Sequence, residues 1–162
     1  MTGDASSPRE QAWSDAAPTA GRVVLLSRNP VSEAIELIAG TTGRVVVLVA
    51  PDTDGQGVAE LEALSLHDGD AVVLCDHDAP DAPAALRLAL ASPASYVAMM
   101  ASRSRSARLL AELSDEGVAG LEKLHVPAGL DTGGKAPGEI ALSVVAEIVA
   151  TAYGRSGGPM RA

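Results

Sequence analysis

The stretch Val23-Val24-Leu25-Leu26-Ser27-Arg28-Asn29-Pro30-Val31-Ser32 decides the fold of this chain. Its first four residues form a continuous apolar run, which is typical of a strand covered on both faces in a parallel sheet. Asn29 and Pro30 then favour a helix start, because asparagine caps the first turn and proline suits the first helical position. Apolar residues continue at helical spacing as far as Ile38, and Gly40 is expected to end the helix.

The same alternation of strand and helix continues to the end of the chain. Strands are predicted at 45–49, 71–75 and 96–100, with an extended piece at 124–127. Helices are predicted around Val58–Leu64 and from Asp81, Ser102 and Pro137 onward. This pattern predicts the α/β class, with a doubly wound, mainly parallel, Rossmann-like sheet in a single domain. The order of the strands is not visible in the sequence.

The ends of the chain differ from its middle in composition. Residues 1–20 are rich in Ala, Ser, Asp and Pro and are expected to form a flexible N-terminal tail, and 155–162 a flexible C-terminal tail. The Rossmann-like domain is expected to span 21–154. A chain of 162 residues has the length of one domain.

Composition limits the partners of the protein. A net charge of −9 argues against a nucleic-acid partner, which needs a basic surface. The sequence contains no apolar run of about 20 residues and no signal-peptide pattern, so no membrane partner is expected. The single cysteine, Cys75, excludes an internal disulfide and favours a reducing compartment. We therefore expect a cytoplasmic protein whose oligomeric state, a homodimer included, stays open.

The first strand-to-helix turn lacks the glycines of an ordinary dinucleotide site. The pattern G-x-G-x-x-G lets the backbone approach a pyrophosphate, whereas this turn contains no glycine and Pro30 removes one amide donor. Ser27 and Arg28 could hold a phosphate through their side chains, but a well-capped helix start is the favoured interpretation. The acid that normally binds a ribose after the second strand is also missing, with Asp52 the only substitute nearby.

The end of the third strand reads Cys75-Asp76-His77-Asp78. Neighbouring residues rarely all face one ion, so no metal site is expected, and Cys75 is interpreted as a small buried apolar group. His77 has no serine in a nucleophile context, so no catalytic residue is predicted there. His67 and His125 are interpreted as isolated, structural histidines.

The fourth turn carries the strongest chemical signal. Ser102, Arg103 and Arg105 stand at a helix start in an acidic protein, where cations oppose the helix dipole. An anionic ligand would reverse that balance, because guanidinium groups and free amides both bind phosphate. A solvated arginine face with Ser102 as its cap is the alternative interpretation.

A glycine loop, 129–134, precedes the last helix. Gly129 suits a backbone that needs positive φ or close approach, and Asp131 could contact a ligand hydroxyl or close a turn. Glu139 falls in the first turn of the helix, where an acid also stabilises the dipole without any function.

Three segments together resemble the XdhC family, accessory proteins for molybdenum-cofactor insertion into xanthine dehydrogenase and related hydroxylases. Tyr96–Arg103 is similar to that family's Y-V-G-x-x-G-S-R, and Pro127–Gly133 to its P-I-G-L-D-I-G. Pro137–Ile148 is similar to P-E-E-I-A-x-S-I-x-A-E-I. The chain departs from the family in its first turn, which usually contains glycine, and in having Ala98 and Ala101 where the family has glycines.

The resemblance implies a Rossmann-like domain that handles a molybdopterin cofactor and does not turn over substrate. Carried over position by position, Ser102, Arg103, Gly129, Asp131 and Glu139 become the preferred binding residues. The sequence does not identify the ligand, for which a molybdopterin dinucleotide and NAD(P) are the candidates. The resemblance implies a molybdenum hydroxylase or a separate accessory subunit as the partner. Family members carry a further N-terminal domain with a cysteine, so we expect this chain to act as a stand-alone accessory domain.

Two other functions remain open from the sequence. An NAD(P)-dependent oxidoreductase would need a proton-transfer group near the nicotinamide, and only His77 or Tyr96 could provide it. A degenerate Rossmann fold could also act purely as a protein-interaction module.

Overall fold

The computed structural model of the protein describes residues 21–49 and 57–161. The predicted N-terminal tail and Asp52 lie outside the described residues. Residues 155–161 are exposed and contain neither helix nor strand. Their flexibility stays a prediction.

The described residues form a five-stranded parallel sheet in the order β2-β1-β3-β4-β5. The strands are β1 (Val23–Leu26), β2 (Val46–Val49), β3 (Ala71–Leu74), β4 (Tyr96–Met99) and β5 (Leu124–His125). The order reverses direction between β1 and β3. Sheets of this kind bind ligands beyond the carboxyl ends of the strands. The predicted Rossmann-like α/β fold in a single domain is confirmed.

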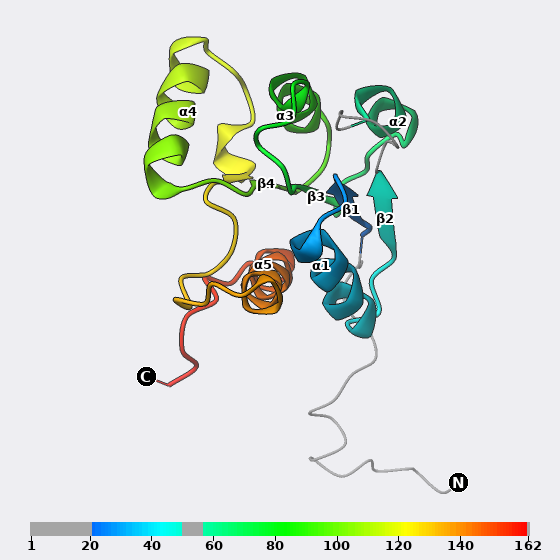
Figure 1. Ribbon diagram of the computed structural model, residues 1–162, viewed down its shortest axis with the longest axis vertical. Coiled ribbons are helices and arrows are strands. Elements are labelled where there is room, and N and C mark those ends of the chain that lie inside the picture. Colours follow the sequence, from blue (N-terminus) through cyan, green and yellow to red (C-terminus); the bar gives the residue numbers. More distant parts are fainter. Residues whose placement is uncertain (1–20, 50–56, 162) are drawn as a thin grey trace, which may run out of the picture.

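Helices cover both faces of the sheet, with α1 and α5 on one side and α2, α3 and α4 on the other (Figure 1). Their bounds are α1 (Pro30–Thr41), α2 (Val58–Ala63), α3 (Ala82–Ala91), α4 (Arg103–Asp115) and α5 (Pro137–Ala152). The strands β1, β3 and β4 are buried along their whole length. This double coverage explains why they read as continuous apolar runs.

Most predicted helix starts are found where the sequence places them. Asn29 caps α1 with Pro30 behind it, Ser102 caps α4, and Pro137 occupies the first turn of α5. The predicted end of α1 at Gly40 is wrong, since the helix continues to Thr41. The glycine that takes a positive φ after this helix is Gly43, at 79°.

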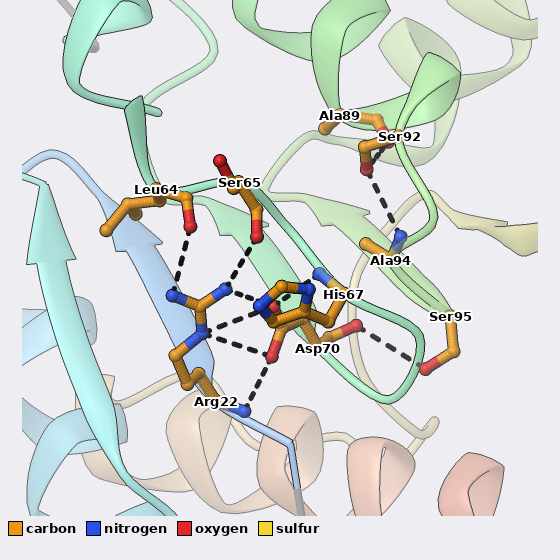
Figure 2. Close-up of polar contacts among 9 residues, drawn as sticks. All are labelled: Arg22, Leu64, Ser65, His67, Asp70, Ala89, Ser92, Ala94 and Ser95. Carbon is orange, nitrogen blue, oxygen red and sulfur yellow. Dashed lines mark hydrogen bonds and ion pairs between the residues drawn. The ribbon is translucent and has the colours of Figure 1, made fainter. Parts of the chain in front are cut away.

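The amino-terminal edge of the sheet is held by a partly buried ion pair between Arg22 and Asp70 (Figure 2). The Asp70 carboxylate, whose side chain is 3% exposed, accepts from Arg22 Nη2 at 2.6 Å, from the Arg22 amide at 2.9 Å and from the His67 amide at 2.8 Å. Arg22 also donates to the carbonyls of Leu64 and Ser65. The pair therefore joins the starts of β1 and β3 to the segment after α2.

No helix within the described ranges has both the length and the apolar character needed to span a bilayer.

Asp70→Asn is expected to lower the free energy of unfolding by about 2 kcal/mol, because it removes the negative charge that accepts hydrogen bonds from Arg22 and the His67 amide. Urea unfolding monitored by circular dichroism measures the loss. Asp68→Asn, an exposed carboxylate in the same turn, is the matched control and should change stability by less than about 0.5 kcal/mol. Equal losses in both variants would contradict a structural role for the pair.

The same pair gives stability a pH dependence. Burial by itself raises the pKa of Asp70, but hydrogen bonds from the Arg22 side chain and from the His67 and Arg22 amides bring the pKa below its ordinary value of 3.8. A carboxylate with a depressed folded pKa contributes fully above its unfolded pKa, and the contribution is lost as pH falls through the folded value. Wild-type protein should therefore lose this stability only below about pH 4, and Asp70→Asn should show a smaller loss there.

Candidate functional site

The first strand-to-helix turn satisfies its own amides. Asn29 Oδ1 accepts hydrogen bonds from the amides of Val31 and Ser32, both at 3.0 Å, and Ser32 Oγ accepts from the Asn29 amide at 2.8 Å. Asn29 Nδ2 donates to the Cys75 carbonyl at 3.0 Å, which ties the turn to the end of β3. The carboxamide oxygen therefore occupies the amides that would otherwise face a phosphate at this helix N-terminus.

The two candidate residues of this turn lie apart from the fourth turn's cluster. Ser27 takes a φ of 74°, a left-handed conformation that glycine adopts more easily. Arg28 has a side chain that is 60% exposed and lies 3.9 Å from Glu33. Neither residue lines the cavity described below.

The start of α4 presents arginines to two sides. Ser102 Oγ accepts from the Arg105 amide at 3.3 Å, so Ser102 serves as the helix cap. Arg103 Nη2 donates to Asp131 in the glycine loop at 3.3 Å. Arg105 Nη1 instead donates to Asp78, after β3, at 2.6 Å. Arg103 and Arg105 therefore face different neighbours, although the sequence places them in one cluster.

A cavity of 380 Å³ lies between the start of α4, the glycine loop and the start of α5. Of the eight candidate residues, Arg103, Gly129 and Asp131 line it. Lys135, which sequence reasoning missed, adds a second cation to the lining. The cavity lies beyond the carboxyl ends of β4 and β5, and α4 begins beside it, so the dipole of α4 adds to the positive potential of Arg103 and Lys135 there. This arrangement favours an anionic ligand.

Gly129 is held by close packing against α5. Its φ is 98°, and a Cβ at this position would lie 2.4 Å from Ser143 Oγ. The Gly129 amide donates to Glu147 at 2.5 Å. The positive φ therefore favours glycine here, and an added Cβ would also force the Ser143 hydroxyl to move.

Glu139 acts as the cap of α5. Its Oε2 accepts from the amides of Lys135 at 2.9 Å and Ala136 at 3.1 Å. Both hydrogen bonds lower the pKa of Glu139, and the one from the Ala136 amide has the larger effect. The ionised carboxylate therefore binds the backbone that leads into α5. Lys135, which belongs to that backbone segment, lines the cavity.

A cluster of three side chains that the sequence does not reveal lies behind the glycine loop. Glu147 contacts His125 Nδ1 and accepts from the Tyr96 hydroxyl at 3.2 Å, in addition to the Gly129 amide. The Tyr96 and His125 rings stack with centroids 4.4 Å apart. The sequence suggested that His125 is isolated, and this is wrong. Its contacts nevertheless fit the structural role that was predicted for it. The three residues are far apart in the sequence, so no local pattern marks them.

The residues after β3 do not form a metal site. Among the described residues, no group of three or more His, Cys, Asp or Glu side chains is arranged to hold a metal ion. Cys75 is buried. This burial, and to a smaller extent the charge of Asp76, raises the pKa of its thiol to about 12. Its interpretation as a small buried group is confirmed by its place in the core.

These features define a Rossmann-like α/β domain whose first strand-to-helix turn is capped by its own side chains and whose cavity lies at the start of α4. Residues 23–148 match the XdhC Rossmann domain, and the chain therefore belongs to the XdhC family.

Two known proteins match this chain over part of their own length. It is 33% identical over 104 residues to the uncharacterized protein YqeB of Escherichia coli K12, covering 63% of this chain and 19% of YqeB. A crystal structure described as a xanthine dehydrogenase from Bacillus halodurans has the same fold, with a TM-score of 0.68 at 20% identity. That match covers 84% of this chain and 44% of the other. The chain thus spans less than half the length of either relative.

Gly129→Ala is expected to destabilise the protein by about 3 kcal/mol, combining positive-φ strain with a steric clash against Ser143. Gly133→Ala is the matched control, since its φ of 79° is also positive but no atom lies within 4 Å of the added Cβ. It should lose only about 1–2 kcal/mol. Urea unfolding of both variants, with Gly129→Ala/Ser143→Ala to test partial rescue, separates strain from clash. Equal losses at the two glycines would contradict the close approach.

Proposed function

We propose that this domain is an accessory module for maturation of a molybdenum hydroxylase, and that it binds a phosphate-bearing ligand over Ser102–Arg105 and Gly129–Asp131. Membership of the XdhC family supports the accessory role. The observation that carries the binding role is the cavity in which Arg103, Lys135 and the glycine loop meet between two helix N-termini. A nucleotide or the phosphate of a molybdopterin cofactor fits this chemistry.

The ion pair across the cavity would yield to such a ligand at little cost. The side chains of Arg103 and Asp131 are 82% and 81% exposed, and their atoms are 3.3 Å apart. Exposed pairs of this kind contribute about 0–1 kcal/mol. A phosphate that forms a charge-assisted, bidentate contact with Arg103 would exceed that contribution. The carboxylate of Asp131 would then be released to contact a ligand hydroxyl.

The geometry disfavours the oxidoreductase alternative. The first-turn amides that normally hold the pyrophosphate of NAD(P) are occupied by Asn29 Oδ1. Tyr96, one of the two proton-transfer candidates, is only 1% exposed. Its burial, and to a smaller extent the charge of Glu147, raises its pKa. His77 lines a separate cavity together with Asp78 and Arg105. Neither of the two proton-transfer candidates therefore lines the Arg103 cavity.

A thermal-shift panel of NAD, NADP, cytidine nucleotides and molybdopterin forms tests the binding site. A ligand at about 100 times its Kd adds about 2.7 kcal/mol, which is readily detected. Arg103→Ala should weaken binding by about tenfold or more, because it removes a charge-assisted hydrogen bond. Arg108→Ala, an exposed arginine on the same helix that does not line this cavity, is the control and should leave the affinity unchanged.

No shift with any ligand, or a shift that Arg103→Ala leaves intact, would overturn this site. The accessory role is tested separately by deleting the protein from its source and measuring the molybdenum content and activity of its hydroxylases. Fully loaded, active hydroxylases in the deletion strain would refute the role whatever the binding result.

A further inference from the structure

Glu147 is a mostly buried carboxylate that lies behind the glycine loop. Its side chain is 13% exposed, and it does not belong to the lining of the Arg103 cavity. The carboxylate accepts from the Gly129 amide at 2.5 Å and from the Tyr96 hydroxyl at 3.2 Å, and it contacts His125 Nδ1. One side chain of α5 therefore joins β4, β5 and the first residue of the glycine loop.

The backbone that enters the glycine loop is held at three successive amides. The Ala128 amide donates to the last carbonyl of β4 at 3.1 Å, and the Leu130 amide donates to a carbonyl of α5 at 3.3 Å. Between them, the Gly129 amide donates to the Glu147 carboxylate. Hydrogen bonds to an ionised acceptor are shorter and about twice as strong as bonds between neutral groups. Glu147 therefore provides the strongest of the three anchors.

This anchor bears on the position of Asp131, which lies two residues beyond Gly129. The Asp131 carboxylate accepts from Arg103 Nη2 at 3.3 Å, and both side chains of this pair are more than 80% exposed. Exposed pairs contribute too little to hold a loop in place. The spacing of the two charges beside the cavity therefore depends on the backbone anchors, of which the one to Glu147 is charged.

The charge of Glu147 and its hydrogen bond to the loop act on an anionic ligand in opposite directions. A nearby negative charge repels an anion. A fixed loop favours binding, because the apparent affinity falls with the fraction of molecules in the binding-competent arrangement. We propose that Glu147 is a positioning residue, which holds Gly129 and thereby keeps Asp131 opposite Arg103. Its effect on ligand binding rests on the proposed function.

Glu147→Asp tests the positioning role, because it keeps the charge and shortens the side chain by one methylene. In ligand-free protein, ¹⁵N NMR should show the Gly129 amide proton moving upfield and a lower ¹H–¹⁵N NOE at the amides of Asp131 and Gly133. Tyr96→Phe is the matched control, since it removes another donor to the same carboxylate. It should leave the three amides unchanged. Unchanged NOE values in Glu147→Asp would overturn the positioning role.

Titration with inorganic pyrophosphate, followed through the Arg103 Nε–H signal, tests the consequence for binding. Glu147→Asp should bind at least about fivefold more weakly than the wild type, since fewer molecules hold the loop in place. Tyr96→Phe should bind as tightly as the wild type. Equal affinity of Glu147→Asp and the wild type would contradict the role in binding. The absence of a saturable shift in the wild type would overturn the phosphate site itself, and the ligand-free NOE values then decide the positioning role.

Glu147→Gln is the second variant, for the case that Glu147→Asp does not fold. The carboxamide keeps the size of the side chain, removes its charge and leaves a weaker, neutral acceptor for the Gly129 amide. A positioning role predicts weaker binding of pyrophosphate, whereas the loss of charge repulsion alone predicts tighter binding. Tighter binding by Glu147→Gln than by the wild type would refute the proposal.

Discussion

The burial of the sheet on both faces is the constraint on which the rest of this structure depends. Helices cover the strands so completely that β1, β3 and β4 have no exposed residue. The polar side chains that contact the sheet are therefore gathered before the amino ends and beyond the carboxyl ends of its strands. With no phenylalanine in the sequence, the core consists mainly of Val, Leu, Ile and Ala, which allows the helices to lie close to the sheet. Every polar cluster described above, at either edge, follows from that arrangement.

At the carboxyl edge of this Rossmann-like sheet, the first strand-to-helix turn and the starts of α4 and α5 differ in structure. Asn29 fills the first helix start with its own side chain, whereas the starts of α4 and α5 converge on a cavity with two cationic residues. Glu147 supports that half from behind, since one carboxylate holds the glycine loop, a histidine and a buried tyrosine. The departure from the dinucleotide pattern is thus local to one turn, and the fold itself is intact.

Local signals in the sequence were enough to predict the fold class, the caps at Asn29 and Ser102 and the glycine loop, because each depends on residues within a few positions. The end of α1 was misplaced at Gly40, since glycine also occurs inside helices and only the last turn's hydrogen bonds identify Gly43 as the terminator. The Glu147 cluster could not be predicted. It depends on which strands become neighbours, and the sequence does not show the strand order. For the same reason, the sequence could not show that Arg103 and Arg105 contact different neighbours.

The two ends of the sheet carry ion pairs that differ sharply in their exposure to water. At the amino edge, Arg22 and Asp70 join the starts of β1 and β3, with side chains that are 25% and 3% exposed. At the carboxyl edge, Arg103 and Asp131 link the start of α4 to the glycine loop, and both side chains are more than 80% exposed. Dissolved salt screens exposed charges far more than shielded ones. Raising the ionic strength should therefore weaken the contact at the carboxyl edge first and leave the amino-edge pair largely intact.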